Sequence, residues 1–302
     1  MKLFLTAICL SLLGFLTSCS PNAGNRDSHA HDSGRPAPDF PTNVTMYEVK
    51  GVLREIRAEG WKALIAHEDI PGYMEAMTMQ LDVKDTNELR GLLPGDQISF
   101  RMLVTDDDGW IDRVKRIGST VTSNPPPAQP VIAVDQLNPG SLLPDFTLTN
   151  QFGQPMHLKD FKGRAFAFTF IFTRCPFPTF CPRMNNNFAE AQRLLASDNT
   201  RTNWSLISIS FDSEYDTPER LSAYSSNYHP DTARWSFATG DDAIIRRLGS
   251  AFGLTYAKEG ALYNHNVRTV VADTQGRVQK IFPNNEWKPE ELVSALQQAM
   301  QE

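Results

Sequence analysis

The feature that constrains this chain most is a stretch in which an apolar run leads directly into two closely spaced cysteines. The run Phe166–Phe172 is almost entirely apolar and predicts a buried strand. Cys175 and Cys181 follow with five residues between them, and each cysteine precedes a proline. Helix-like polar sequence begins near Arg183, and Pro182 suits the first turn because the N–H that it lacks would have no intrahelical partner there. The sequence therefore predicts a strand, a two-cysteine loop and a helix in succession.

Two thiols in one short loop after a strand are typical of thioredoxin-type redox chemistry or of metal binding. A thiolate at a helix N-terminus lies near partially positive backbone amides, which lower its pKa. The other two cysteines, Cys9 and Cys19, lie in or just after an apolar N-terminal run, so the mature chain is not a disulfide scaffold. We therefore expect Cys175 and Cys181 to act as one functional pair.

The N-terminus predicts a lipoprotein signal peptide over residues 1–18. Lys2 supplies positive charge, and Leu3–Leu16 is an apolar run too short for a comfortable membrane span. The residues up to Cys19 (Leu-Thr-Ser-Cys) resemble a bacterial lipobox, which implies cleavage before Cys19 and attachment of lipid to it. The alternative is an ordinary signal peptide with an incidental cysteine. We expect a location in the bacterial cell envelope, lipid-anchored to a membrane and facing the periplasm or the cell exterior.

A length of 302 residues allows two domains, and composition divides the chain accordingly. Residues 19–43 are rich in Pro, Gly, Ser, Asn and Asp and predict a disordered tether. Residues 44–117 predict a small β-rich domain, residues 118–139 a Pro-rich linker, and residues 140–302 a larger domain. The net charge of −6 argues against a nucleic-acid partner.

The small domain contains a series of short strand patterns separated by turn signals. The predicted strands are Val44–Glu55, Trp61–His67, Met77–Val83, Gln97–Val104 and Trp110–Arg116. Short strands at this spacing, with no intervening helix, indicate a small all-β, OB-like barrel.

A histidine and three methionines in this domain, His67, Met74, Met77 and Met79, are candidate ligands of a metal site. Met77 and Met79 point to the same face of a strand. Thioether sulfur suits Cu(I), and an imidazole can complete a low-coordinate site. The alternative is that the methionines only fill a core. The stretch resembles the periplasmic CusF-like copper-binding domain, whose motif is a histidine, a tryptophan and then Met-x-Met. Here no tryptophan lies between His67 and Met77, and Tyr73 and Met74 lie near its place.

In the larger domain, predicted strands alternate with predicted helices around the cysteine loop. The strands are Phe146–Thr149, Phe166–Phe172, Trp204–Phe211, Trp235–Thr239, Arg268–Asp273 and Val278–Phe282. The helices are Arg183–Leu195, Thr217–Tyr224, Asp242–Phe252 and Lys288–Met300. This order favours a thioredoxin-like α/β fold.

The larger domain resembles the Sco/SenC family throughout. The matching features are Pro144-Asp145-Phe146, Thr173-Arg174-Cys175-Pro176, Cys181-Pro182, Phe211-Asp212, Asp216-Thr217-Pro218-Glu219, and His265 shortly before Arg268–Asp273. The resemblance implies that Cys175, Cys181 and His265 bind copper, as Cu(I) or Cu(II). It also implies a role in assembling the dinuclear CuA centre of cytochrome c oxidase, as copper donor, as thiol reductant, or both. The implied partners are the oxidase subunit that carries CuA and copper donor or thiol reductant proteins.

The donor set suits this chemistry, because two thiolates satisfy Cu(I) and an added imidazole allows Cu(II). Oxidation of the pair to a disulfide would remove the metal site. The family's usual spacing has three residues between the cysteines and this chain has five, which we expect to affect affinity and potential more than pairing.

Two other functions remain open. One is a thiol-disulfide oxidoreductase or peroxidase-like reductase that uses Cys175 and Cys181 without metal, and the other is copper buffering or resistance. Thioredoxin-type reductases carry a cis-proline facing the cysteine pair, but no proline lies between Pro230 and Pro283. That absence favours a metallochaperone over an enzyme, with thiol-disulfide reductase activity left open.

Three charged residues near the motif have two interpretations each. Asp212 and Asp216 are either a pair that supports the site or docks a partner, or solvated loop acids. Arg174 either lowers the pKa of Cys175 or faces solvent.

Overall fold

The computed structural model describes residues 43–119, 136–198 and 202–301. The predicted signal peptide, Cys19, nearly all of the predicted tether and most of the predicted linker lie outside the described residues, so these assignments and the domain boundaries stay predictions. In the part of the chain that the structure describes, no helix is long and apolar enough to cross a membrane.

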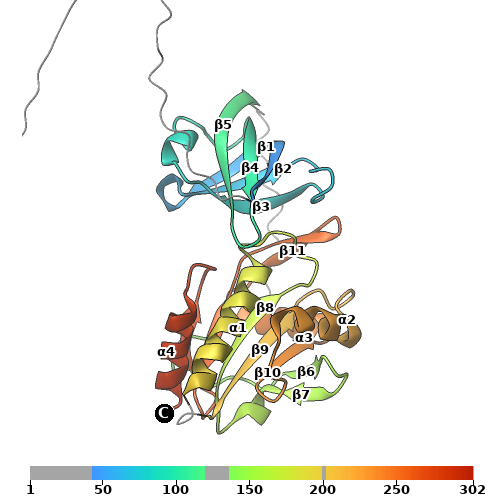
Figure 1. The fold of residues 1–302 in the computed structure, drawn as a ribbon, viewed down its shortest axis with the longest axis vertical. Coiled ribbons are helices and arrows are strands. Elements are labelled where there is room, and N and C mark those ends of the chain that lie inside the picture. Colours follow the sequence, from blue (N-terminus) through green and yellow to red (C-terminus); the bar gives the residue numbers. More distant parts are fainter. Residues whose placement is uncertain (1–42, 120–135, 199–201, 302) are drawn as a thin grey trace, which may run out of the picture. The chain divides into compact units, whose positions relative to one another are not determined.

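The small domain is an antiparallel sheet of five strands in the order β3-β2-β1-β4-β5 (Figure 1). The strands are β1 Thr45–Arg57, β2 Lys62–His67, β3 Met77–Asp82, β4 Asp96–Val104 and β5 Gly109–Ser119. A bridge between Val83 and Ile111 links the end of β3 to β5, and this contact closes the sheet toward a barrel. The predicted all-β domain is confirmed.

Buried and partly exposed residues alternate strictly along β2 and β3, and this pattern determines which side chains enter the barrel core. Every second residue of each strand is buried, ending with His67 in β2 and beginning with Met77 in β3. The two strands pair so that His67 lies opposite Met77, and Ile65 lies opposite Met79. His67, Met77 and Met79 therefore share one face of the sheet.

The larger domain contains a seven-stranded sheet in the order β14-β13-β8-β9-β10-β6-β7. The strands are β6 Thr147–Asn150, β7 Pro155–His157, β8 Ala165–Ile171, β9 Trp204–Ser210, β10 Trp235–Thr239, β13 Thr269–Ala272 and β14 Val278–Phe282. The central strands β8, β9 and β10 are parallel, and the others pair antiparallel. Every residue of β8 and β9 is buried, as the continuous apolar run of β8 predicts.

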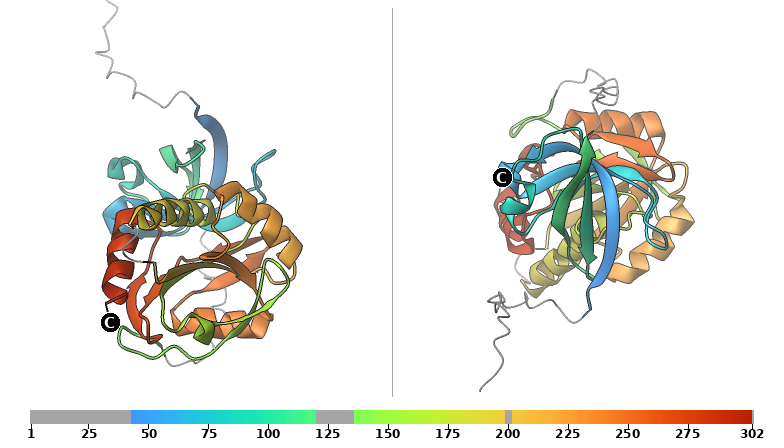
Figure 2. Two further views of the ribbon diagram at one scale, coloured as in Figure 1. Left: turned by 60° about the horizontal axis from the view of Figure 1, so that its bottom comes forward. Right: turned by 90° about the horizontal axis from the view of Figure 1, so that it is seen from above.

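Helices cover both faces of this sheet (Figure 2). The helices are α1 Cys181–Ser197, α2 Pro218–Ser225, α3 Asp242–Ala251 and α4 Pro289–Ala299. Short 3₁₀ turns occur at Ala58–Gly60, Thr86–Leu89, Leu158–Phe161 and Ser226–Tyr228. α1 and α4 pack on each other and on β8. The predicted thioredoxin-like α/β fold is confirmed.

A short hairpin that the sequence analysis missed carries His265. It consists of β11 Tyr256–Glu259 and β12 Leu262–His265, which pair antiparallel with Tyr256 opposite His265. Gly260 lies in the turn at φ +61°, a left-handed conformation that favours glycine. His265 is thus the last residue of a strand, not a residue of an irregular loop.

Candidate metal centre

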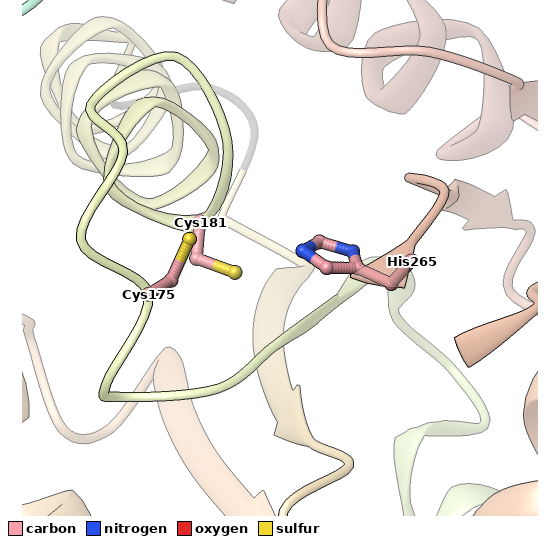
Figure 3. A group of neighbouring side chains, drawn as sticks. All are labelled: Cys175, Cys181 and His265. Carbon is pink, nitrogen blue, oxygen red and sulfur yellow. The ribbon is translucent and has the colours of Figure 1, made fainter. Parts of the chain in front are cut away.

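Two thiols and an imidazole from three separate segments meet at one end of the α/β domain (Figure 3). Cys175 lies in the loop after β8, Cys181 is the first residue of α1, and His265 ends β12. The sulfur atoms and an imidazole nitrogen all lie within 4.8 Å of one another. The structure therefore brings together the three residues predicted as ligands, despite the longer cysteine loop. We refer to this group as the thiol centre.

A buried carboxylate anchors the start of the cysteine loop. Asp216 Oδ2 accepts the Thr173 N–H at 3.0 Å, and Oδ1 accepts the Thr173 hydroxyl at 2.5 Å. The Ser210 hydroxyl also donates to Asp216 Oδ2 at 2.5 Å. Burial raises the pKa of Asp216 above its ordinary value, although these three hydrogen bonds oppose the shift. Asp216 thus fixes the backbone two residues before Cys175.

A second buried acid, Asp212, holds the next residue of the loop. Asp212 Oδ2 accepts from Arg174 Nη2 at 2.5 Å, and Asp212 Oδ1 accepts from the Tyr263 hydroxyl at 3.1 Å. The Arg174 guanidinium also stacks over Tyr215, 4.0 Å from the ring centroid. Asp212 and Asp216 are both fully buried, so their interpretation as solvated loop acids is wrong. Arg174 is held by Asp212 and Tyr215. Neither interpretation of Arg174 from the sequence, a charge that lowers the pKa of Cys175 or a side chain that faces solvent, included these contacts.

The two thiols have opposite electrostatic properties. Burial raises the pKa of Cys175, but hydrogen bonds from Cys181 and His265 outweigh burial and lower that pKa to about 5. Burial and the neighbouring Cys175 raise the pKa of Cys181 well above its ordinary value, although the Phe172 N–H points at its sulfur at 3.4 Å. The metal-free centre therefore holds one thiolate, at Cys175, beside one thiol.

The His265 imidazole is oriented by its own backbone and by aromatic rings. Its Nδ1 lies 2.8 Å from the Asn266 carbonyl oxygen, which can only accept, so Nδ1 carries a proton and Nε2 is the ring nitrogen available to the thiols or to a metal ion. Phe172, Phe180 and Phe211 pack around the ring, with centroids 5.5, 5.4 and 5.1 Å away. The sequence analysis missed this aromatic enclosure. The available signal was that Phe172 and Phe211 each directly follow a buried parallel strand.

His67 in the barrel makes the same Nδ1 hydrogen bond to the carbonyl of the following residue. Its Nδ1 donates to the Glu68 carbonyl at 2.7 Å, and burial lowers its pKa, so the ring is neutral near pH 7. His67 is only 3 % exposed, and its Nε2 has no hydrogen-bond partner among the described residues. A buried nitrogen without a partner is costly, and a metal ion would remove that cost. Burial of Met77 and Met79 fits the core-filling alternative, whereas the unpartnered His67 Nε2 favours a ligand site.

The segment between His67 and Met77 folds back on itself through a bridge between Ile70 and Met74. Tyr73 stacks on Tyr47 with ring centroids 4.7 Å apart, and Met74 is buried. Burial raises the pKa of Tyr73, so its hydroxyl stays protonated and acts as a donor. Where the CusF-like motif has a tryptophan, this chain therefore presents a buried thioether beside a stacked tyrosine.

Comparisons with known proteins cover both domains. Residues 134–301 match the family model described as SCO1/SenC, and residues 46–116 match the model described as copper binding periplasmic protein CusF. A SCO1 protein homolog of Bacillus subtilis (strain 168) is 36% identical over 95 residues, which are 32% of this chain and 47% of that protein. A SCO2-like protein of Rickettsia prowazekii is 26% identical over 144 residues, which are 45% of this chain and 67% of that protein.

The chain thus spans about half the length of the first of these curated relatives. Among solved structures, a SCO1/SenC family lipoprotein from Bacillus anthracis is 26% identical, with a TM-score of 0.49. That similarity covers 54% of this chain and 98% of the other.

Proposed function

Because this chain belongs to the SCO1/SenC family, we propose that it is an exported, membrane-tethered copper chaperone that assists assembly of the cytochrome c oxidase CuA site. Copper is its cargo, held by Cys175, Cys181 and His265. The observation that carries the proposal is the convergence of these three ligand atoms within 4.8 Å. The partners that follow are the oxidase subunit carrying CuA and the proteins that supply copper or reduce the thiols.

The donor set fits copper in either oxidation state. Two thiolates suit Cu(I), and the imidazole adds a ligand that Cu(II) prefers. Cys175 already holds a thiolate, so of the two thiols only Cys181 has to lose its proton, and we expect copper binding to release protons. The aromatic rings packed around His265 fix the orientation of its imidazole, which favours retention of a bound ion.

A second candidate function is thiol-disulfide exchange by the same pair without metal. The pairing of a low-pKa thiol at Cys175 with a high-pKa thiol at Cys181 supports it, because an attacking thiolate beside a resolving thiol is the usual arrangement for that chemistry. Its weakness is His265, which disulfide exchange does not require.

Titration of Cu(I) into the reduced full-length protein, against a competing chelator, tests the proposal. Cys175→Ser and His265→Ala are each expected to remove or weaken one equivalent of copper. His229→Asn is the matched control, because His229 is exposed and its φ of +49° suits asparagine. If His265→Ala leaves both the reductase activity of the cysteine pair and the copper affinity unchanged, the oxidoreductase function replaces the chaperone function.

A deletion strain separates assembly from copper buffering. We expect loss of the protein to lower cytochrome c oxidase activity, and added copper to restore part of it. Unchanged oxidase activity together with reduced copper tolerance would instead assign the protein to buffering or resistance.

A further inference from the structure

One small pocket is lined both by the barrel methionines and by the thiol centre. Its lining from the barrel is Met74, Met77 and Met79, and its lining from the larger domain includes Cys175 and His265. The remaining lining residues are aromatic or apolar: Phe172, Pro176, Phe177, Phe180 and Tyr263. The cavity measures about 20 Å³, which is room for one water-sized occupant. Two sets of soft ligands therefore border the same confined space.

The strand that carries two of these methionines is hydrogen-bonded to the β11–β12 hairpin. The N–H of Thr78, which lies between the two strand methionines, donates to Glu259 Oε2 at 2.5 Å. The N–H of Ala261, in the hairpin turn, donates to Glu75 Oε2 at 2.9 Å. β3 also packs on β12, the strand that ends in the centre's imidazole. The position of the methionines is thus coupled to that of His265.

The cysteine loop contacts the barrel as well. The Tyr73 hydroxyl donates to the Pro176 carbonyl at 3.3 Å. Gly109 packs so closely on Phe177 that a Cβ at Gly109 would lie 2.5 Å from the ring. All of these contacts lie inside one compact unit, residues 41–302. The pocket is therefore bordered by specific contacts on the Cys175 side and on the His265 side.

We propose that Cu(I) passes through this pocket directly from the barrel site of His67, Met77 and Met79 to the thiol centre. This inference rests on the proposed function and adds the route by which the centre is loaded. The unpartnered Nε2 of His67, buried opposite Met77, marks the barrel side as a ligand site rather than packing alone. Met74, at the pocket wall, is placed to hold the ion between the two sites.

The transfer is a ligand exchange in which copper stays Cu(I) and no electron moves. Bonds from copper to thioether sulfur and to His67 Nε2 break, and bonds to Cys175 and Cys181 sulfur form. The thioethers and imidazole leave as neutral groups, and the Cys181 proton passes to solvent. An anionic thiolate attracts Cu(I) more strongly than a neutral thioether does, so the exchange runs from barrel to thiol centre.

Loading kinetics of the full-length reduced protein test this route. The probe is a Cu(I)–chelator complex, and the readout is the ultraviolet absorption of Cu(I)–thiolate bonds at the thiol centre. In Met77→Leu/Met79→Leu, which removes both thioethers at similar volume, loading is expected to slow about tenfold, because the locally tethered donor is lost. Met102→Leu is the control, since Met102 is buried in the barrel core but does not line the pocket.

A second variant leaves every candidate ligand in place. Gly109→Ala sets a methyl group against Phe177 and is expected to slow loading with unchanged equilibrium affinity. Full loading at the wild-type rate in both Gly109→Ala and the double methionine variant overturns the transfer route only. Absence of loading in the wild-type protein overturns the proposed function, and this inference with it.

Discussion

The two candidate metal sites use the same imidazole arrangement with two kinds of sulfur. His67 and His265 each donate Nδ1–H to the carbonyl of the following residue, at 2.7 and 2.8 Å, so that Nε2 is the ring nitrogen available to bind a metal ion. The barrel site adds thioethers, which do not ionise, whereas the thiol centre adds sulfurs that ionise and can form a disulfide. It follows from this comparison that thiol oxidation should control copper binding at the thiol centre and leave copper binding at the barrel site unchanged.

The sites also differ in how the chain builds them. The barrel site comes from two neighbouring strands, so its geometry follows from the pairing of His67 with Met77. The thiol centre joins a loop, a helix start and a distant hairpin, and it depends on buried acids to hold the loop. Perturbations of the tertiary structure should therefore affect the thiol centre first.

The largest expected effect is loss of copper from one site on oxidation. Diamide treatment of the copper-loaded protein should join Cys175 to Cys181, remove both thiolates and release all copper from the thiol centre. Barrel-bound copper should stay, which a chelator assay of retained copper measures. Cys175→Ser/Cys181→Ser is the control, because diamide should not change its copper content. Equal loss of copper from both sites would contradict the expected difference between them.

The next effect concerns thiol reactivity in the metal-free protein. Burial raises the pKa of Cys175, but the hydrogen bonds from Cys181 and His265 lower it to about 5, so the reactive thiolate predominates above about pH 5 and disappears below it. Iodoacetamide should therefore modify Cys175 with a midpoint near pH 5, while Cys181 stays unreactive at neutral pH. His265→Ala should raise that midpoint, and His229→Asn should not. An unchanged midpoint in His265→Ala would contradict the hydrogen bond between His265 and Cys175.

A smaller effect is expected from the ion pair that holds the cysteine loop. Arg174→Ala leaves the fully buried Asp212 without its cation and should lower the free energy of unfolding by about 2 kcal/mol, less than for a fully buried pair because Arg174 is partly exposed. Urea unfolding measures the change, and Arg174→Ala/Asp212→Asn should recover part of it. Arg193→Ala, at an exposed ion pair in α1, should have no measurable effect. Equal stability of the Arg174 and Arg193 variants would contradict this role.

The smallest expected change in stability separates the two interpretations of the methionines. Met77→Leu conserves volume and should change the free energy of unfolding by less than about 1.5 kcal/mol. The same substitution should nevertheless remove copper from the barrel, as measured by chelator competition. Met102→Leu should change stability as little and leave barrel copper intact. Retention of copper in Met77→Leu would mean that this methionine only fills the core.

The regular elements could be predicted from the sequence because their patterns are long. The apolar run of β8, the cap and proline at Thr217-Pro218, and the alternation around Met77 each carry enough periodic signal to place a strand or helix. The hairpin β11–β12 was missed because its four-residue strands are too short for alternation to stand out. The proposed ligand role of His265 rests on a family resemblance, and its place on a strand came from the structure.

The supporting residues could not be predicted, since burial is decided by tertiary packing. Nothing in the sequence around Asp212 and Asp216 distinguishes a buried anchor from a solvated loop acid. Likewise, no local pattern reveals that Met77 and Cys175 border one pocket, because the residues that close it lie in different domains.

The hydrogen bond from Thr78 to Glu259 has a consequence for the solubility of the protein. β3 is the outermost strand of its sheet, and an outermost strand with free N–H groups is a template for pairing with other chains. Here the Glu259 carboxylate accepts a hydrogen bond from one such N–H, that of Thr78, and places a negative charge beside the strand. The contact that aligns the methionines with the thiol centre therefore also guards the barrel against sheet extension and aggregation.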